Sequence, residues 1–280
     1  MADGWRIVPP CSDPAFTHEV LEYCTNLDIS LVIPTIDTEL AVYAHQRRRF
    51  AEHGVQIAIS GPRTVEIAMS KDVTSRFLES AGVPTVKNYS AYVEGADPPP
   101  FPVIIKPRQG SGSKGIHRAD DLESFRFYLR KTADPVVQEF VDGVEYTVNF
   151  FVDRSGRCLS AVPHVRVETR SGEVSKCVTV REPTLMAYAD RLAASLPDAW
   201  GPLCFQAVVD SESRAKVIEL NARLGGGYPV AHAAGVNYVR WLVDDARGLP
   251  LPEPSNVWRD GLAMIRWEDA VFTTAADVGM

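Results

Sequence analysis

The first 70 residues alternate between short apolar runs and amphipathic stretches. The apolar runs predict strands at residues 5–8, 29–33 and 55–59, and helical periodicity predicts helices at 14–23, 39–52 and 63–69. Such an alternation is typical of a parallel α/β layer. The run at 29–33 is almost entirely apolar, as expected of a strand that helices cover on both faces. The pattern therefore predicts a small α/β domain over residues 1–70.

After residue 70 the pattern changes to strands that mostly follow one another directly. We predict strands at 101–106, 116–119, 136–141, 144–152, 158–167, 203–209, 216–224 and 262–267. Helices are predicted from a Ser70 cap to Gly82, from an Asp120 cap over 122–131, from Pro183 to Pro197, and at 229–234 and 238–246. This mixture indicates an α+β arrangement, which we divide into domains at 71–140 and 141–280.

Polar side chains recur at every second position within the predicted strand 216–224. If this stretch is extended, Glu219, Asn221 and Arg223 share one face, with Val217 beside them and Ile218 on the opposite face. Carboxylate and amide oxygens next to a fixed cation suit a Mg²⁺ ion that holds phosphate oxygens. The alternative interpretation is a solvated polar face at a sheet edge.

Further polar residues on neighbouring predicted strands extend this candidate site. Gln206 stands on the preceding strand of the predicted hairpin, and its amide oxygen is a candidate third ligand of the same metal. If it were buried without a partner it would cost about 1–3 kcal/mol. Glu145 is a candidate for bonding a pair of hydroxyls. Arg166 is either a candidate anion ligand or part of a solvated strand end.

Two acidic residues follow the predicted strand at 29–33. Asp37 and Glu39 lie at the carboxyl end of that strand, the edge where open α/β sheets bind ligands. They are therefore either substrate contacts or, as we favour, caps of the helix that follows. Taken alone, Lys71 in the first turn of its helix is an exposed lysine whose charge opposes the helix dipole.

A glycine-rich stretch follows the strand 101–106. Gly110, Gly112 and Gly115 fit the spacing of a dinucleotide fingerprint, but that motif should lead directly into a helix. Here the stretch joins two predicted strands. It therefore resembles a flap whose backbone N–H groups cover phosphates, with Lys106 at its base. A flexible hairpin is the alternative.

Composition and charge narrow the functional classes. The chain has 280 residues, 45% of them hydrophobic, and a formal net charge of −7, which argues against general binding of nucleic acid or acidic membranes. The five cysteines are scattered without metal or redox spacing, as in a reduced cytoplasmic protein. We see no export signal and no apolar run of membrane-spanning length, so we expect a cytoplasmic enzyme.

The order of these motifs is more specific than any one of them. Lys71, Lys106 before the glycine flap, Gln138-Glu-Phe-Val141, Glu145, Gln206 and Glu219-x-Asn-x-Arg223 follow one another along the chain. This set resembles the ATP-grasp superfamily, most closely its carbamoyl-phosphate-synthetase-like branch of carboxylate–amine ligases. The resemblance covers roughly residues 1–250. It implies an ATP-grasp fold, of mixed α/β and α+β class, with a shortened N-terminal Rossmann-like domain.

The resemblance also implies roles for individual residues. Lys71 and Lys106 would bind phosphates, and the backbone of Ser111, Gly112, Ser113 and Gly115 would close over them. Arg223, with Lys106, would be catalytic and would steady the transferring phosphoryl group. The Glu139 carbonyl and the Val141 amide would meet adenine, and Glu145 would bind the ribose. The metal ligands would be Gln206, Glu219 and Asn221.

The implied activity is activation of a small carboxylate as an acyl phosphate, using ATP and Mg²⁺ (or Mn²⁺), followed by attack of an amine. Two departures leave alternatives open. Gln206 stands where many relatives carry a second carboxylate. A further strand–helix unit before Trp5 is absent, so we expect the substrate end either to be incomplete or to be completed by a second copy of the chain or a partner subunit. The alternatives are a non-catalytic ATP-binding subunit and a kinase that forms acyl or carbamoyl phosphate.

Overall fold

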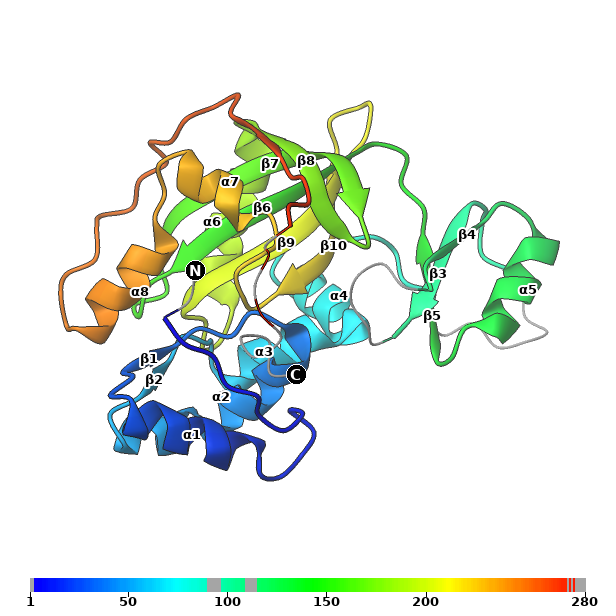
Figure 1. The fold of residues 1–280 in the computed structure, drawn as a ribbon. Helices are drawn as coiled ribbons and strands as arrows, with labels where there is room; N and C mark the ends of the chain where they lie inside the picture. The colour runs from blue at the N-terminus through cyan, green and yellow to red at the C-terminus, as the bar shows by residue number, and fades with distance from the viewer. Residues whose placement is uncertain (1–2, 90–96, 109–114, 271, 273, 275–280) are drawn as a thin grey trace.

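The computed structural model describes residues 3–89, 97–108, 115–270, 272 and 274. The N-terminal part contains α1 (Phe16–Asn26), β1 (Leu31–Val32), α2 (Asp37–Glu52), β2 (Gln56–Ile57), α3 (Pro62–Met69) and α4 (Lys71–Ser80). β1 and β2 pair in parallel, as predicted, but each spans only two residues. These helices lie beneath the large sheet in Figure 1.

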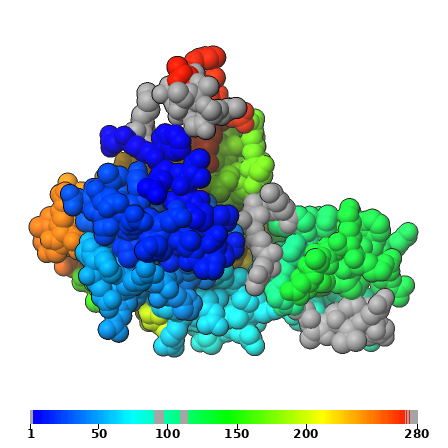
Figure 2. All heavy atoms as spheres, turned by 60° about the horizontal axis from the view of Figure 1, so that its bottom comes forward, coloured from blue at the N-terminus to red at the C-terminus, as the bar shows by residue number. Residues whose placement is uncertain are grey.

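A small lobe follows α4 and stands apart from the rest of the molecule (Figures 1 and 2). It contains β3 (Val103–Pro107), β4 (His117–Ala119), α5 (Leu122–Lys131) and β5 (Pro135–Glu139). The three strands pair in the order β4-β3-β5, all antiparallel. α5 packs on them through Phe125, which belongs to a core that the lobe does not share with the other sheets.

The large sheet carries most of the remaining chain. Its strands are β6 (Val144–Val152), β7 (Cys158–Arg170), β8 (Glu173–Thr179), β9 (Gly201–Val209), β10 (Ala215–Asn221) and β11 (Ala263–Ile265), in the order β10-β9-β6-β7-β8-β11. Its helices are α6 (Pro183–Ser195), α7 (Tyr228–Ala233) and α8 (Tyr238–Ala246). Every pairing in this sheet is antiparallel.

The two faces of the large sheet differ in what covers them. On β6, Val148 and Phe150 point into the main hydrophobic core, whereas Phe151 points into a second core that contains α8. Because side chains alternate along a strand, Glu145, Thr147 and Asn149 lie on the same face as Phe151. One end of this face is therefore covered by α7 and α8, and its other end is polar, as predicted.

The N-terminal helices and the large sheet form one continuous core. Phe50 of α2 and Leu78 of α4 are completely buried, in the same cluster as Phe205 of β9 and Leu220 of β10. The α/β layer at the N-terminus therefore stands on the back of the large sheet, opposite its polar face.

Several local predictions differ from the structure, including the Ser70 cap, whose side chain makes no capping hydrogen bond to α4. Residues 5–8 form no strand, and Trp5 and Ile7 are exposed. α5 is capped by Asp121 rather than Asp120, because the Asp121 carboxylate accepts a hydrogen bond from the Ser124 N–H at 2.8 Å. Strand β8 was not predicted. Val217 does not share the face of Glu219.

A β-bulge explains the position of Val217. Its strand β10 pairs Val217 with Ala207 but Glu219 with Gln206, so Ile218 is an extra residue without an opposite partner. The extra residue reverses the alternation of side chains. Val217 is thus fully buried in the main core, and Ile218 lines the cavity described below. In the described part of the chain, no helix has the length and apolar character needed to cross a membrane.

The shared core predicts that the N-terminal helices and the large sheet unfold together. We expect Phe50→Ala to lower the free energy of unfolding by about 3–5 kcal/mol, because it leaves a large cavity in that core. Phe127→Ala, at an exposed position on α5, is the control and should cost little. Denaturant titration should be followed by far-ultraviolet circular dichroism and by tryptophan fluorescence. A separate early transition in Phe50→Ala, confined to part of the helical signal, would contradict the shared core.

Candidate functional site

One cavity of about 400 Å³ lies between the small lobe and the polar face of the large sheet. Its walls include every predicted site residue that the structure describes, apart from Gly115: Lys71, Lys106, Glu139, Val141, Glu145, Gln206, Glu219, Asn221 and Arg223. Ser111, Gly112 and Ser113 lie outside the described residues. Residues from α4, β3, β5, β6, β9 and β10 are therefore brought together at this cavity.

The three predicted metal ligands lie side by side on β9 and β10. Glu219 is directly opposite Gln206, and Asn221 is opposite Cys204, two residues further along both strands. Because of the bulge, Glu219 and Asn221 face the cavity. Within the described residues their side chains have no hydrogen-bond partner, nor does that of Gln206. One carboxylate and two amide oxygens are thus free to bind, a set of hard oxygen ligands that fits Mg²⁺.

Two lysines approach this oxygen cluster from the other side of the cavity. Lys106, at the end of β3, has only 4% of its surface exposed, and this burial lowers its pKa to about 8 despite the nearby carboxylate of Glu219. Lys71 donates a hydrogen bond to the Arg108 carbonyl at 3.2 Å, and burial lowers its pKa as well. A buried ammonium group gains stability from a bound anion, so both side chains suit phosphate oxygens.

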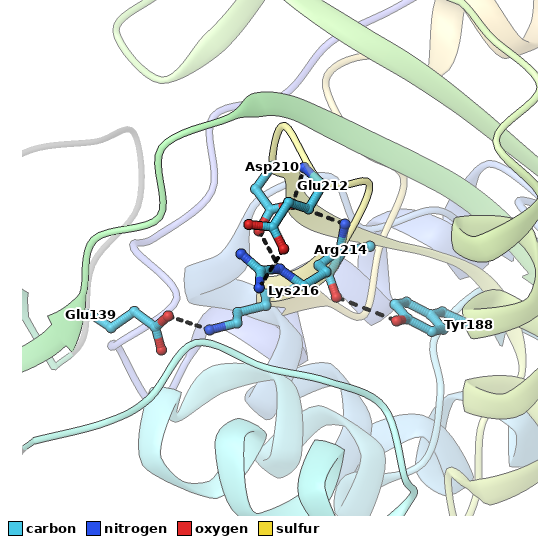
Figure 3. Close-up of polar contacts among 7 residues, drawn as sticks. Glu139, Tyr188, Asp210, Glu212, Arg214 and Lys216 are labelled. Atoms are coloured by element: carbon cyan, nitrogen blue, oxygen red, sulfur yellow. Dashed lines mark hydrogen bonds and ion pairs between the residues drawn. The ribbon is translucent and has the colours of Figure 1, made fainter.

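The segment after β5 connects the lobe to the large sheet and lines the cavity at Glu139 and Val141. The Glu139 carboxylate forms an ion pair with Lys216 of β10 and accepts the Lys87 backbone N–H at 2.8 Å. Figure 3 shows this ion pair reaching across to the β9–β10 hairpin. These contacts hold the side chain toward Lys216 and Lys87.

The hairpin that carries Lys216 is itself held by charged contacts. Arg214 donates to the Asp210 carboxylate at 2.7 Å and pairs with Glu212 at 2.9 Å, and Tyr188 of α6 donates to the Ala215 carbonyl (Figure 3). These contacts fix the turn before β10. The register of Glu219 against Gln206 is therefore supported from the turn as well as from the sheet.

Glu145 meets Arg166 at the cavity wall. Their closest atoms, Oε2 and Nε, are 3.4 Å apart, and the arginine also donates to the Thr147 hydroxyl and to the Gly172 carbonyl. The Arg166 side chain is largely buried, which decides against a solvated strand end. Arg166 forms an ion pair with Glu145 and so helps to hold that carboxylate in place.

Arg223 is bound by a residue from the N-terminal helices. Its Nε and Nη2 atoms donate to the two oxygens of Asp37 at 2.6 and 2.8 Å. The neighbouring Glu39 instead accepts the backbone N–H groups of Thr35 and Ile36 at 2.8 and 3.2 Å. The favoured capping interpretation therefore holds for Glu39 and is wrong for Asp37.

The glycine run after Asn221 rests directly on polar side chains. A Cβ atom on Gly225 would lie 2.9 Å from the sulfur of Cys204, and one on Gly226 or Gly227 would collide with Glu173 or His164. His164 is completely buried, and neither of its ring nitrogens has a partner among the described residues. Burial, aided by Arg166, lowers the pKa of His164 to about 3, so the ring is neutral.

Glu173 lines the cavity and was not predicted, because its strand β8 was missed. A signal for this strand exists in the sequence. The dipeptide Ser171-Gly172 has positive φ at both residues, 49° and 81°, which defines a two-residue type I′ hairpin turn between β7 and β8. A search for Ser-Gly turns between alternating stretches would have placed Glu173 at the start of a strand.

Comparison with known proteins gives two family matches. A model described as an ATP-grasp domain matches residues 68–227, more than half of the chain. A model described as a PylC-like N-terminal domain matches residues 1–58. The two matches divide the chain between the N-terminal α/β layer and the segments that form the cavity.

Curated relatives agree with these matches over parts of their length. A D-alanine–D-alanine ligase of Fusobacterium nucleatum is 32% identical over 108 residues, 39% of this chain and 37% of that protein. The C-terminal section of a carbamoyl phosphate synthase large chain from Methanopyrus kandleri is 25% identical over 227 residues, 72% of this chain and 42% of that protein. The chain thus spans about two fifths of the length of these relatives.

A solved structure confirms the predicted fold class. This structure is the biotin carboxylase domain of a Hydrogenobacter thermophilus 2-oxoglutarate carboxylase, determined with MgADP and bicarbonate. The match covers 92% of this chain and 62% of the chain in that structure. The TM-score is 0.72 at 17% sequence identity. The family matches and the curated relatives confirm the resemblance predicted from the ordered motifs.

The lowered pKa of Lys106 predicts how anion binding depends on pH. Below pH 8 the Lys106 amine is mostly charged, and above pH 8 it is increasingly neutral. Above pH 8, binding of a phosphate group therefore requires uptake of a proton by Lys106, which weakens the observed affinity. Calorimetry should show the affinity for Mg·ADP falling by about tenfold between pH 7.5 and 9.5. In Lys106→Arg the charge persists, and this fall should flatten. Equal slopes in both proteins would exclude Lys106 as the titrating group.

Proposed function

The chain belongs to the ATP-grasp family, and we propose that it is an ATP- and Mg²⁺-dependent ligase. In this proposal it activates a small carboxylate as an acyl phosphate, which an amine or a similar nucleophile then attacks, with release of ADP and phosphate. The observation that carries the proposal is the convergence of Lys71, Lys106, the Gln206–Glu219–Asn221 cluster and Arg223 on one cavity.

The residues of the chain suit this reaction by position and charge. Phosphoryl transfer needs alignment and charge neutralisation more than it needs a protein nucleophile. Lys71 and Lys106 would hold the phosphates. The small lobe would exclude water from the side of the cavity opposite the large sheet. The backbone at Glu139 and Val141 would bind adenine, and Glu145 would bind the ribose hydroxyls.

Gln206, Glu219 and Asn221 would hold Mg²⁺, which supplies charge neutralisation at the phosphate oxygens when it is bound. With a single carboxylate among the three, this set favours one tightly held ion. Arg223 lies two residues beyond Asn221 and would contact the transferring phosphoryl group.

Both steps of the reaction balance without a further reagent. In the first, a substrate carboxylate oxygen attacks the γ-phosphorus of ATP, and the bond between the γ-phosphorus and the ADP oxygen breaks. The nucleophile then attacks the acyl carbon as phosphate leaves with the bonding electrons. A neutral amine attacks, and its excess proton passes to solvent or phosphate. Arg223 and Lys106 offset the negative charge that both steps gather at the phosphoryl oxygens.

A substrate screen tests the proposal directly. The purified chain is incubated with Mg·ATP and a panel of small carboxylates and amines, and ADP, phosphate and amide are measured. We expect phosphate release that depends on one acid and an amide that depends on one amine. Mg·ATP binding without turnover would instead support a non-catalytic subunit. Acyl phosphate trapped as hydroxamate, without amide, would support a kinase.

Two substitutions should separate metal binding from nucleotide binding. Glu219→Ala removes the only carboxylate of the metal cluster, so we expect kcat to fall by at least about a thousandfold. Lys106→Ala removes a phosphate contact and should mainly weaken Mg·ATP binding. Glu253→Ala, at an exposed position that does not line the cavity, is the matched control and should retain activity. Near-normal turnover in Glu219→Ala would overturn the metal assignment.

A further inference from the structure

Asp37 of α2 forms a bidentate contact with Arg223. Its carboxylate accepts from Nε and from Nη2 of Arg223 at 2.6 and 2.8 Å, a planar arrangement that a guanidinium and a carboxylate share. The side chains are 27% and 14% exposed, so solvent screens the pair only partly. The two residues lie 186 positions apart in the sequence and come from the two regions with separate family matches.

The remaining donors of Arg223 show what this contact leaves free. A guanidinium has five N–H groups in a fixed plane. Asp37 takes one from Nε and one from Nη2, and the Leu224 carbonyl takes one from Nη1 at 3.1 Å. Two N–H groups, one on each Nη atom, have no partner among the described residues, and Arg223 lines the cavity. Three bonds thus fix the plane in which the two free donors lie.

Other duties for Asp37 are taken by its neighbours. Glu39 accepts the N–H groups that precede α2, so Asp37 is not needed there. The main core holds α2 on the large sheet through buried residues such as Phe50, so the ion pair is not what keeps the region folded. Arg223 could not be oriented this way by Leu224 alone, because one hydrogen bond leaves the plane free to turn.

We propose that Asp37 is a positioning residue that orients Arg223 toward the transferring phosphoryl group, so that the N-terminal region completes the active site. This inference rests on the ligase function proposed above. It assigns Asp37 no contact with substrate. The carboxylate acts through Arg223. It holds the guanidinium in one orientation, which the side chain would otherwise adopt only part of the time.

A matched control exists elsewhere in the molecule. Asp245 of α8 also joins the N-terminal region to the rest of the chain, accepting from Gln56 of β2 at 3.1 Å and from Arg154 at 2.7 Å. None of these three residues lines the site cavity. Asp245→Asn therefore weakens a contact between the two regions away from Arg223. Asp37→Asn weakens a comparable contact that involves Arg223 itself.

The test compares steady-state kinetics and nucleotide binding in these variants. For Asp37→Asn we expect kcat to fall by about thirtyfold, with KM for ATP changed less than about threefold, because orientation matters most in the transition state. Asp245→Asn should stay within about twofold of the wild-type kcat. In an Arg223→Lys background, which lacks the planar fork, Asp37→Asn should cost less than about threefold more.

Three results would overturn the proposal. Equal losses in Asp37→Asn and Asp245→Asn would mean that the contact only holds the regions together. Faster turnover in Asp37→Asn would mean that Asp37 competes with substrate for Arg223. Additive effects in the double variant would mean that Asp37 acts independently of Arg223. Thermal unfolding of each variant accompanies the kinetics, and Asp37→Glu, which keeps the charge, should restore part of the activity.

A binding measurement separates this proposal from the ligase proposal. If no acid supports turnover, the ligase function fails, but Arg223 can still be probed with Mg·AMP-PNP, a non-hydrolysable ATP analogue. Asp37→Asn should then lower the affinity for Mg·AMP-PNP about twofold and leave that for Mg·ADP unchanged, since only the analogue carries a γ-phosphoryl group. Equal changes for both ligands would reject the role of Asp37 even in an inactive protein.

Discussion

The register between β9 and β10 is the constraint on which the site depends. It places Glu219 opposite Gln206 and Asn221 opposite Cys204, and the bulge at Ile218 turns those side chains toward the cavity while Val217 stays in the core. Without the extra residue, Glu219 would point into the apolar core, where an unpaired carboxylate costs several kcal/mol. The same strand can therefore supply apolar packing at one end and oxygen ligands at the other.

Charge balance in the cavity follows from that register. Lys106 and Lys71 are buried opposite Glu219, and the pKa of each is lowered chiefly by burial, although Glu219 opposes the shift. In Arg223 the net direction is opposite: burial lowers its pKa, but the hydrogen bonds that it donates to Asp37 and the surrounding charges outweigh burial and raise the pKa above the ordinary value. A permanent charge thus stands beside two adjustable ones, an arrangement suited to a ligand whose charge changes during reaction.

Local sequence signals predicted most of the elements but not the contacts between distant ones. α3, α5, α6 and β6 were placed within one or two residues, because Pro, Gly and capping residues mark their ends. β8 was missed because it carries mixed polar residues that do not alternate clearly, although the Ser171-Gly172 turn before it is a local signal. The bulge in β10 and the pair between Asp37 and Arg223 depend on packing across the whole chain. Strand alternation alone could therefore place Asn221 beside Glu219 but could not reveal Val217 in the core.

The connection between the small lobe and the large sheet determines which part of the molecule can move. Within a few residues the chain changes partners: Val86 bonds to Val217 of β10, and Tyr89 bonds to Val137 of β5. The N-terminal helices share their core with the large sheet, whereas the lobe has its own. Because the cores are separate, a rotation of the lobe relative to the large sheet would turn about residues 86–89 and 139–143. The ion pair between Glu139 and Lys216 joins the two sides of this connection, so such a rotation would have to stretch or break it.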